Sequence, residues 1–404
     1  MQASLQSQRH IGLDVIRGII IFAILIININ YISTPSLLRY NPLAFGEFTL
    51  LDSWVWGFEY GLIKQRFMPL LSLMFGAGIY LFAQKYKRLE QSPTQPFVLR
   101  TLALIAIGMV HAYLIWDGDV LVSYAVCGLA AFFMRNLPNK VLLTLGAIMV
   151  FAPVAPYIYD SWQAIGTTIE DPKSWLPNAE AALKMQTSYD KSWLELTPAR
   201  IDVAIGRQTS DLLYFTFWRC TGLMLIGIVL MRNGFLLGKS NYRLPIIISL
   251  ALGLPLSIIP TYYYVQSDFS YQFFNTYLAL GFYLGSVILA FTYLFLLIQW
   301  TKTTAFMAVQ KIFAKLGRMA LTLYIMQSVI CGFIFYGYGL NLFAKVSRSE
   351  LVLITIAIWL FQLAFTLLWF KKFNTGPLEA LWRACYTRKP KMETSQNAVT
   401  TNIS

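Results

Sequence analysis

Long apolar runs separated by short polar stretches recur along the whole chain. Each run is long enough to cross a bilayer as a helix, which takes roughly 17–25 residues. The alternating pattern of an outer-membrane barrel is absent from the sequence. Because backbone groups inside a bilayer must hydrogen-bond within the chain, the runs predict an all-α, polytopic membrane protein. We expect about ten spanning helices, with approximate limits 17–34, 66–84, 98–116, 119–136, 140–159, 211–232, 244–264, 273–299, 316–337 and 351–370.

The spans form one predicted transmembrane domain over residues 1–370. Within it, Trp54 to Ile63 is apolar but too short to cross, so we expect it at the interface or as a re-entrant segment. Residues 160–210 contain three tryptophans, which are typical of the headgroup layer, and predict an outer loop that lies over the outer face as a lid. Residues 371–404 predict a cytoplasmic tail that is partly disordered, chiefly over the polar stretch 387–404.

Composition agrees with a membrane protein. Hydrophobic residues make up 57% of the chain and charged residues 13%, and the mean hydropathy is +0.57. Soluble domains carry about 25% charged residues, so these values exclude a disordered protein, a coiled coil and an ordinary soluble enzyme. The net charge of +13 does not require a nucleic-acid partner, because cytoplasmic loops of membrane proteins collect Lys and Arg. Placing both chain ends in the cytoplasm puts most basic residues inside, so we predict an N-in, C-in topology.

Four cysteines and two histidines limit the covalent and metal chemistry. The cysteines show no disulfide or Cys-x-x-Cys pattern, and two histidines are too few for a dedicated zinc site of the usual composition. We therefore expect no metal ion. The sequence sets no oligomeric state.

Polar residues at depth are the informative ones in such a chain, because they are costly in a bilayer and usually face the bundle interior. In the first span, Asp14, Arg17 and Asn28 share one helix face, with Asn28 about 16 Å deeper than Arg17. This spacing suits a site that runs along the helix. The alternative is an interfacial ion pair with an interhelical asparagine hydrogen bond.

The third span repeats this layout, with Arg100 at its inner end and His111 deeper on the same face. Asp117 and Asp119 follow in a tight Asp-Gly-Asp turn. A neutral imidazole beside a carboxylate is the usual arrangement of an oriented general base. The alternative is a packing histidine followed by two solvated turn aspartates.

Three further residues stand out at depth. Arg219 lies inside the sixth span, where an unpaired guanidinium is expensive, and Asp117, Asp119 or Glu59 could pair with it. Tyr324 and Gln327 lie on one polar face of the ninth span. Structural salt bridging and interhelical hydrogen bonding explain these residues as well as substrate binding does.

These residues also carry a family resemblance. The chain resembles the YeiB-like family of bacterial inner-membrane proteins, whose C-terminal half is a domain of unknown function. The matching stretches occur in the same order as in the family, from residue 13 to residue 383. The matching stretches are Leu13–Gly18 with Asn28, Leu73–Gly78, His111–Asp119, Gly317–Thr322 with Arg318, Tyr324 and Gln327, and Gly376–Glu379 followed by Leu381–Arg383. The resemblance implies a multi-pass protein of the bacterial inner (cytoplasmic) membrane, surrounded by lipids.

The family is in turn distantly similar to transmembrane acyltransferases, which move an acyl group from cytoplasmic acyl-CoA to an acceptor across the membrane. In the lysosomal glucosaminide enzyme of that group, an Arg-Gly pair opens a helix and an asparagine eleven residues after the arginine is implicated in catalysis. Arg17, Gly18 and Asn28 match that pattern. The catalytic histidine of that enzyme follows in the next loop, whereas Tyr31 to Arg66 contains no histidine here, and His111 belongs to another helix.

The first functional hypothesis is therefore an acyltransferase with acyl-CoA as a loosely bound donor and a small-molecule or lipid-linked acceptor at the outer face. His111 is the expected base, Asp117 or Asp119 orients it, and Asn28 stabilises an oxyanion. Phosphates of the donor are expected on Arg17, Arg100 and Arg318. We expect His111, Asn28 and one aspartate on a single cavity that opens to the outer face, with the arginines at its inner end.

Two other classes stay open. A transporter or flippase for a small polar or lipid-linked compound is supported by prolines in or near the spans, such as Pro69, Pro153 and Pro255, which can break helices at a binding site. A non-catalytic scaffold or sensor is the third possibility.

Overall fold

The computed structural model describes residues 2–44, 48–164, 166–167, 170, 172 and 174–387. Over these ranges every regular element is helical, which confirms the predicted all-α class. The predicted disorder after residue 387 lies outside the described residues. In chain order the main elements are α1 (Gln2–Ser33), α2 (Leu50–Phe58), η3 (Glu59–Ile63), α3 (Phe67–Arg88), α4 (Thr94–Val110), η4 (His111–Ile115), α5 (Leu121–Met134), α6 (Asn139–Phe151), α7 (Val154–Ala164), α8 (Ala179–Gln186), α9 (Trp193–Gly206), η5 (Arg207–Thr216), α10 (Phe217–Arg232), α11 (Arg243–Gln266), α12 (Tyr271–Phe273), η7 (Phe274–Leu278), α13 (Ala279–Thr301), α14 (Met307–Arg318), α15 (Ala320–Phe335), α16 (Arg348–Trp369) and α17 (Pro377–Ala384).

Eight helices in the described part of the chain are long and apolar enough to cross a membrane. The pair α14 and α15, bent by 78° at its junction, makes a ninth if it counts as one span. The tenth predicted span corresponds to α5, which has 14 residues and is shorter than a full crossing. The protein is therefore a multi-pass membrane protein with eight or nine candidate spans, fewer than the ten predicted.

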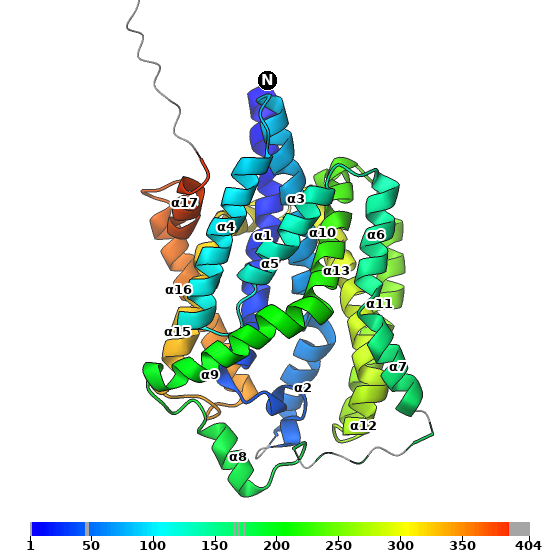
Figure 1. Ribbon diagram of the computed structural model, residues 1–404, viewed down its shortest axis with the longest axis vertical. Helices are drawn as coiled ribbons and strands as arrows, with labels where there is room; N and C mark the ends of the chain where they lie inside the picture. Colours follow the sequence, from blue (N-terminus) through cyan, green and yellow to red (C-terminus); the bar gives the residue numbers. More distant parts are fainter. Residues whose placement is uncertain are drawn as a thin grey trace, which may run out of the picture.

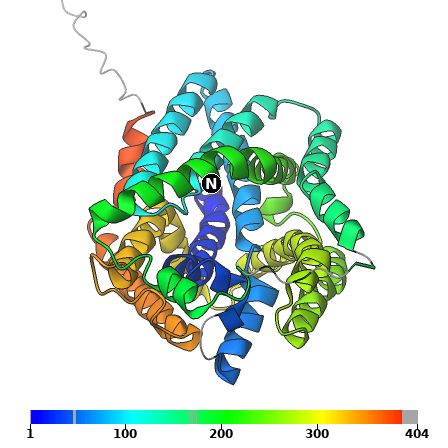
Figure 2. The same ribbon diagram turned by 60° about the horizontal axis from the view of Figure 1, so that its bottom comes forward.

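Helix α1 runs through the middle of the bundle, and Figure 2 shows the other helices around it. Its closest neighbour is α14, and two glycines allow the two backbones to approach. A Cβ added at Gly317 would collide with the carbonyl oxygen of Asp14, and one at Gly18 would collide with that of Phe313. The same device joins α3 to α10, where a Cβ at Gly76 would meet the Met224 carbonyl.

The α4–α5 hairpin brings His111 and the Asp-Gly-Asp turn together, and α9 crosses over its end (Figure 1). Trp193 and Arg200 of α9 both donate hydrogen bonds to the Leu114 carbonyl, at 2.9 and 3.2 Å. Part of the predicted outer loop, residues 160–210, is therefore helical and covers the hairpin turn.

The N-terminal end of α1 and the short helix α17 lie at the same end of the bundle (Figure 1). We call this the basic end, because Arg88, Lys239, Arg318 and Arg383 lie there around one opening. Residues 377–384, within the predicted tail, form α17 and pack against α15 and α4. The N-in, C-in prediction places the basic end in the cytoplasm, and that sidedness stays a prediction.

Candidate functional site

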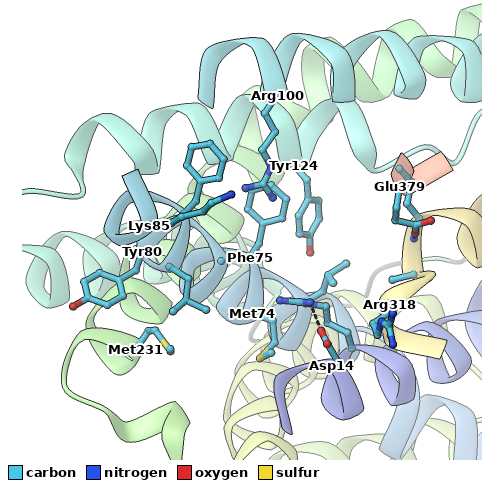
Figure 3. Close-up of a pocket in the computed structure, with 18 of the residues that line it drawn as sticks. Asp14, Met74, Phe75, Tyr80, Lys85, Arg100, Tyr124, Met231, Arg318 and Glu379 are labelled. Carbon is cyan, nitrogen blue, oxygen red and sulfur yellow. Dashed lines mark hydrogen bonds and ion pairs between the residues drawn. The ribbon is translucent and has the colours of Figure 1, made fainter. Parts of the chain in front are cut away.

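A cavity of about 1190 Å³ opens at the basic end. Its walls come from α1, α3, α4, α5, α10 and α17 and from the junction of α14 with α15. Figure 3 shows Lys85, Arg100, Arg318 and Glu379, which come from four different helices, around this space. The cavity is therefore built by parts of the chain that are far apart in sequence.

The wall of the cavity is strongly positive. Two acidic residues line it, and both are already engaged: Asp14 pairs with Arg17 at 2.6 Å, and Glu379 accepts backbone N–H groups of α15. A wall with this excess of cations suits a ligand with phosphate or other anionic groups. The cationic side chains are Arg17, Lys85, Arg88, Arg100, Arg232, Lys239, Arg318 and Arg383.

Aromatic rings rather than carboxylates hold two of these arginines. The Arg100 guanidinium lies 4.7 Å from the centre of the Trp382 ring, and the Trp382 indole donates to the Arg100 carbonyl at 2.8 Å. Arg318 lies 4.7 Å from the Phe370 ring. Cation–π contacts orient a guanidinium without neutralising it, so its charge stays available to a ligand.

The inner part of the cavity is apolar. Ile21, Ile24, Met74 and Leu104 line it, and Ile24 lies about 10 Å further along α1 than Arg17. Tyr124 also lines it, with its hydroxyl bonded to the Met68 carbonyl at 2.8 Å. A charged mouth and an apolar inner part fit an amphiphilic ligand that has an anionic end.

His111 and Asp119 form a hydrogen-bonded pair beside the inner end of the cavity. The Nδ1 of His111, which is fully buried, lies 2.8 Å from an Asp119 oxygen. The other Asp119 oxygen accepts the Val122 N–H at 2.9 Å, which fixes the carboxylate. A carboxylate can only accept, so Nδ1 donates this hydrogen bond, and in the neutral imidazole Nε2 then bears the lone pair.

Tyr324 connects this pair to the cavity. Its ring lies 5.1 Å from that of His111, and Tyr324 itself lines the cavity. Within the described part of the chain, neither the His111 Nε2 nor the Tyr324 hydroxyl has a hydrogen-bond partner. Two buried side chains with unused hydrogen-bonding capacity therefore lie next to each other, and one of them lines the basic cavity.

The structure brings together some of the predicted site residues and separates others. Arg17, Arg100, Arg318 and Tyr324 line one cavity. Asn28 is half-buried and lines neither this cavity nor the smaller one described below. Neither of these two cavities brings Asn28 together with His111, so their convergence on a cavity open to the outer face stays a prediction.

Asp117 and Gln327 lie outside the cavity lining. Burial raises the pKa of the Asp117 carboxyl, and the positive charges of Arg207, Arg39 and Arg200 oppose that rise. Gln327 donates to the Ile21 carbonyl at 3.2 Å and to Gln362 at 3.0 Å, an interhelical hydrogen-bonding arrangement.

Arg219 has polar partners inside the bundle, as its depth requires, although not the expected carboxylates. It donates to Ser286 at 2.7 Å and to the Gln65 side chain at 3.1 Å. Its guanidinium also lies 4.6 Å from the Tyr283 ring. Glu59, one of the partners predicted for it, pairs instead with Arg348.

A second buried polar cluster, at the end of α1 away from the basic end, has no counterpart among the sequence-based predictions. Arg348 donates to Asn30 at 3.0 Å and to Glu59 at 3.2 Å, and Asn30 donates to Glu59 at 3.2 Å. Asn30 and Arg348 lie at the ends of apolar runs, where polar residues are ordinary, so the sequence carries no signal for them.

Comparison with known proteins identifies the family. Residues 230–389 match the family described as "Protein of unknown function (DUF418)". The chain is 31% identical to "Uncharacterized protein YeiB" of Escherichia coli K12, over 93% of this chain and 96% of the relative. It is 27% identical to "Uncharacterized protein YxaH" of Bacillus subtilis 168, over 95% and 96% of the two chains. No solved structure matches significantly. Near-complete coverage at 31% identity shows that the chain belongs to the YeiB family.

Proposed function

We propose that the protein is an acyltransferase of the bacterial inner membrane, which takes its acyl group from acyl-CoA bound in the cavity at the basic end. The acceptor is a hydroxyl or an amine of a small or lipid-linked molecule. The observation that carries this proposal is the His111–Asp119 pair, which lies with a free Nε2 against Tyr324 at the inner end of the basic cavity.

The cavity supports an acyl-CoA donor through its shape and charge. A nucleotide end with several phosphates suits the cations at the mouth, among them Arg17, Arg100 and Arg318. The pantetheine arm and the acyl chain suit the apolar inner part, near Ile21 and Ile24. Such a ligand would place its thioester near Tyr324, beside the His111–Asp119 pair.

The stretches that carry the family resemblance support the same location. Leu13–Gly18, Leu73–Gly78, Gly317–Thr322 and Gly376–Arg383 each contribute residues to the cavity wall. The fifth stretch, His111–Asp119, holds the buried pair next to it. A family signature concentrated around one cavity favours that cavity as the place where the family acts.

The chemistry assigned to these groups is ordinary acyl transfer. The His111 Nε2 takes the proton of the acceptor O–H or N–H as the acceptor attacks the thioester carbonyl carbon. The Tyr324 hydroxyl donates to the oxyanion of the tetrahedral intermediate. The C–S bond then breaks, the new ester or amide forms, and His111 gives the proton from Nε2 to the sulfur, so that coenzyme A leaves as the thiol. Asp119 keeps Nδ1 protonated and the ring oriented.

The test is an acyl-transfer assay on the full chain, purified in detergent with native lipid extract as the acceptor source. Radiolabelled acetyl-CoA is supplied, and free coenzyme A and labelled extractable product are measured. We expect His111→Gln to lower turnover by about 100-fold or more, the scale of a lost general base. His10→Ala, which changes the other histidine of the chain, is the matched control and should leave turnover unchanged.

Thermal unfolding of each variant separates chemistry from folding. Loss of turnover with an unchanged unfolding midpoint supports a catalytic His111. Equal loss of folded protein and of turnover supports a packing role and contradicts the proposal. A wild-type protein that neither hydrolyses nor transfers the label from acetyl-CoA or longer acyl-CoA donors also contradicts it.

A transporter of amphiphilic anions is the second candidate, and one observation favours it. The cavity opens at the basic end, whereas the Arg348–Glu59 pair and Asn30 join helices at the other end. A cavity open at one end and closed at the other is what alternating access requires of one state. Uptake of labelled acyl-CoA into proteoliposomes without any release of free coenzyme A would favour this candidate over the enzyme.

A further inference from the structure

A second, much smaller cavity lies at the end of α1 away from the basic end. Its volume is about 20 Å³, and it is lined by Asn30, Arg39, Trp56, Glu59, Lys64 and Arg348 among others. Asn30 lies about 20 Å further along α1 than Arg17, so this cavity is separate from the basic cavity. A space of this size holds one water molecule or one small ion.

Basic side chains outnumber acidic ones around the small cavity. Three cationic side chains and one carboxylate line it, and that carboxylate, Glu59, pairs with Arg348 at 3.2 Å. Lys64 is only 6% exposed, and its ammonium lies 4.0 Å from the Tyr60 ring and 4.6 Å from the Tyr40 ring. Among the residues that the structure describes, neither Lys64 nor Arg39 has a carboxylate within 4.0 Å. The Lys64 side chain donates to the Arg39 carbonyl at 3.3 Å, and Arg39 is half-buried, so the lining of the small cavity holds more hydrogen-bond donors than anionic groups.

An unsatisfied donor points to the same missing group. Trp56 is 1% exposed and stacks on Tyr60 with the ring centres 4.5 Å apart. This tryptophan lines the cavity, and its indole N–H has no acceptor in the described ranges. An indole N–H can only donate, so its partner must be an acceptor. The Nε of Arg39, also at this cavity, is a second buried donor without an acceptor in those ranges.

We propose that the small cavity binds one small monovalent anion, with Trp56, Lys64 and Arg39 as its ligands. Water has two lone pairs, whereas an anion can accept from Trp56, Lys64 and Arg39 at the same time. Chloride and the carboxylate end of a short acid such as acetate share the required chemistry. The proposal concerns the end of the bundle remote from the basic cavity, and it does not depend on acyl transfer.

The test is anion titration of the full chain, purified in detergent with sodium gluconate as the only salt. Chloride, bromide or acetate replaces gluconate at constant ionic strength, and the thermal unfolding midpoint is followed. We expect a saturable rise with chloride and bromide if a halide fits, or with acetate if a carboxylate fits. Trp56→Phe keeps the ring stack and removes the N–H, and it should weaken the apparent affinity by about tenfold.

Control variants distinguish a specific anion site from a general effect of salt. Trp359→Phe removes an indole N–H that already has a partner, the Phe22 carbonyl at 3.2 Å, and Lys345→Gln removes an exposed cation. Both should titrate like the wild type. In Lys64→Gln the unfolding midpoint should no longer respond to any of the anions. If this variant does not fold, bromide quenching of tryptophan fluorescence is measured instead. That quenching should be stronger in the wild type than in Trp56→Phe.

Three results would overturn the proposal. These are an unfolding midpoint that does not respond to any of the anions, a response that does not saturate, and a response that Trp56→Phe and Trp359→Phe share equally. In each case the small cavity holds water only, or the salt acts by general screening. Activity with acetyl-CoA plays no part in the readout, so the two proposals fail or succeed separately.

Discussion

Glu379 offers the sharpest test of how the basic cavity is held together. Its carboxylate, on α17, accepts the backbone N–H groups of Leu321 and Thr322 at 2.7 and 3.1 Å and the Thr322 hydroxyl at 2.6 Å. These groups belong to the first turn of α15, directly after the 78° bend. The side chain therefore acts as a helix cap supplied from a distant part of the sequence.

The two obvious substitutions should have different costs. Glu379→Gln keeps an oxygen for the N–H groups but removes the negative charge from the helix N-terminus, which costs about 1–2 kcal/mol. Glu379→Ala leaves two backbone donors and a hydroxyl without this acceptor in a site where Glu379 is only 8% exposed, which costs about 3–5 kcal/mol. The loss of unfolding free energy in Glu379→Gln measures the contribution of the negative charge. The additional loss in Glu379→Ala measures the contribution of the hydrogen bonds.

Thermal unfolding in detergent, with trypsin cleavage after Arg383 as a local probe, gives the comparison. We expect the cleavage rate to be lowest in the wild type, higher in Glu379→Gln and highest in Glu379→Ala. The reason is that α17 undocks more often as its contacts weaken. Glu350→Gln is the matched control: it changes an exposed glutamate that caps its own helix through Ser347, and its effect should be smaller. If Glu379→Ala unfolds and is cleaved like the wild type, the proposed capping role is refuted.

Two further predictions follow from packing and from charge. Gly317→Ala should destabilise the protein by about 1–3 kcal/mol, because the added Cβ overlaps the Asp14 carbonyl. Gly206→Ala, whose added Cβ meets open space, should be neutral or slightly stabilising. Thermal unfolding of the two variants checks this prediction. The raised pKa of Asp117 means that the folded state binds its proton more tightly than the unfolded state, so stability should fall as pH rises from about 4 through the folded pKa. Asp117→Asn should remove that loss, and an unfolding midpoint whose pH dependence equals that of the wild type would contradict this role of Asp117.

The sequence predicted the fold class and the span positions well, because both depend on the length and polarity of local runs. It predicted about ten spans, and the difference from the eight or nine candidates includes α5, whose fourteen residues are fewer than a full crossing needs. The bend between α14 and α15 depends on packing against α1 and α17, and no local pattern at Gly317 or Arg318 announces its angle.

Within the candidate site, helical spacing predicted correctly which residues of one helix share a face. It did not predict which residues of other helices that face contacts. Arg17 and Arg100 do line one cavity, and His111 does contact Asp119. Asn28 does not line the cavity of Arg17 and Arg100, because a face shared with Arg17 along α1 does not specify which helix that face meets further on. Asn30, two residues away, enters a polar cluster with residues from α16 and η3 that no periodicity connects.

The walls of the basic cavity come from both ends of the polypeptide, since Asp14 and Tyr386 both line it. Synthesis of the intervening chain, at about 5–20 residues per second, takes about 20 to 75 s. During that time the arginines of the early helices face an unfinished site, because Glu379 and Trp382 have not yet left the ribosome. The wall of the basic cavity is therefore completed late in biogenesis, and a truncation after the final span removes Glu379 and Trp382 from it while leaving the helices of the other walls.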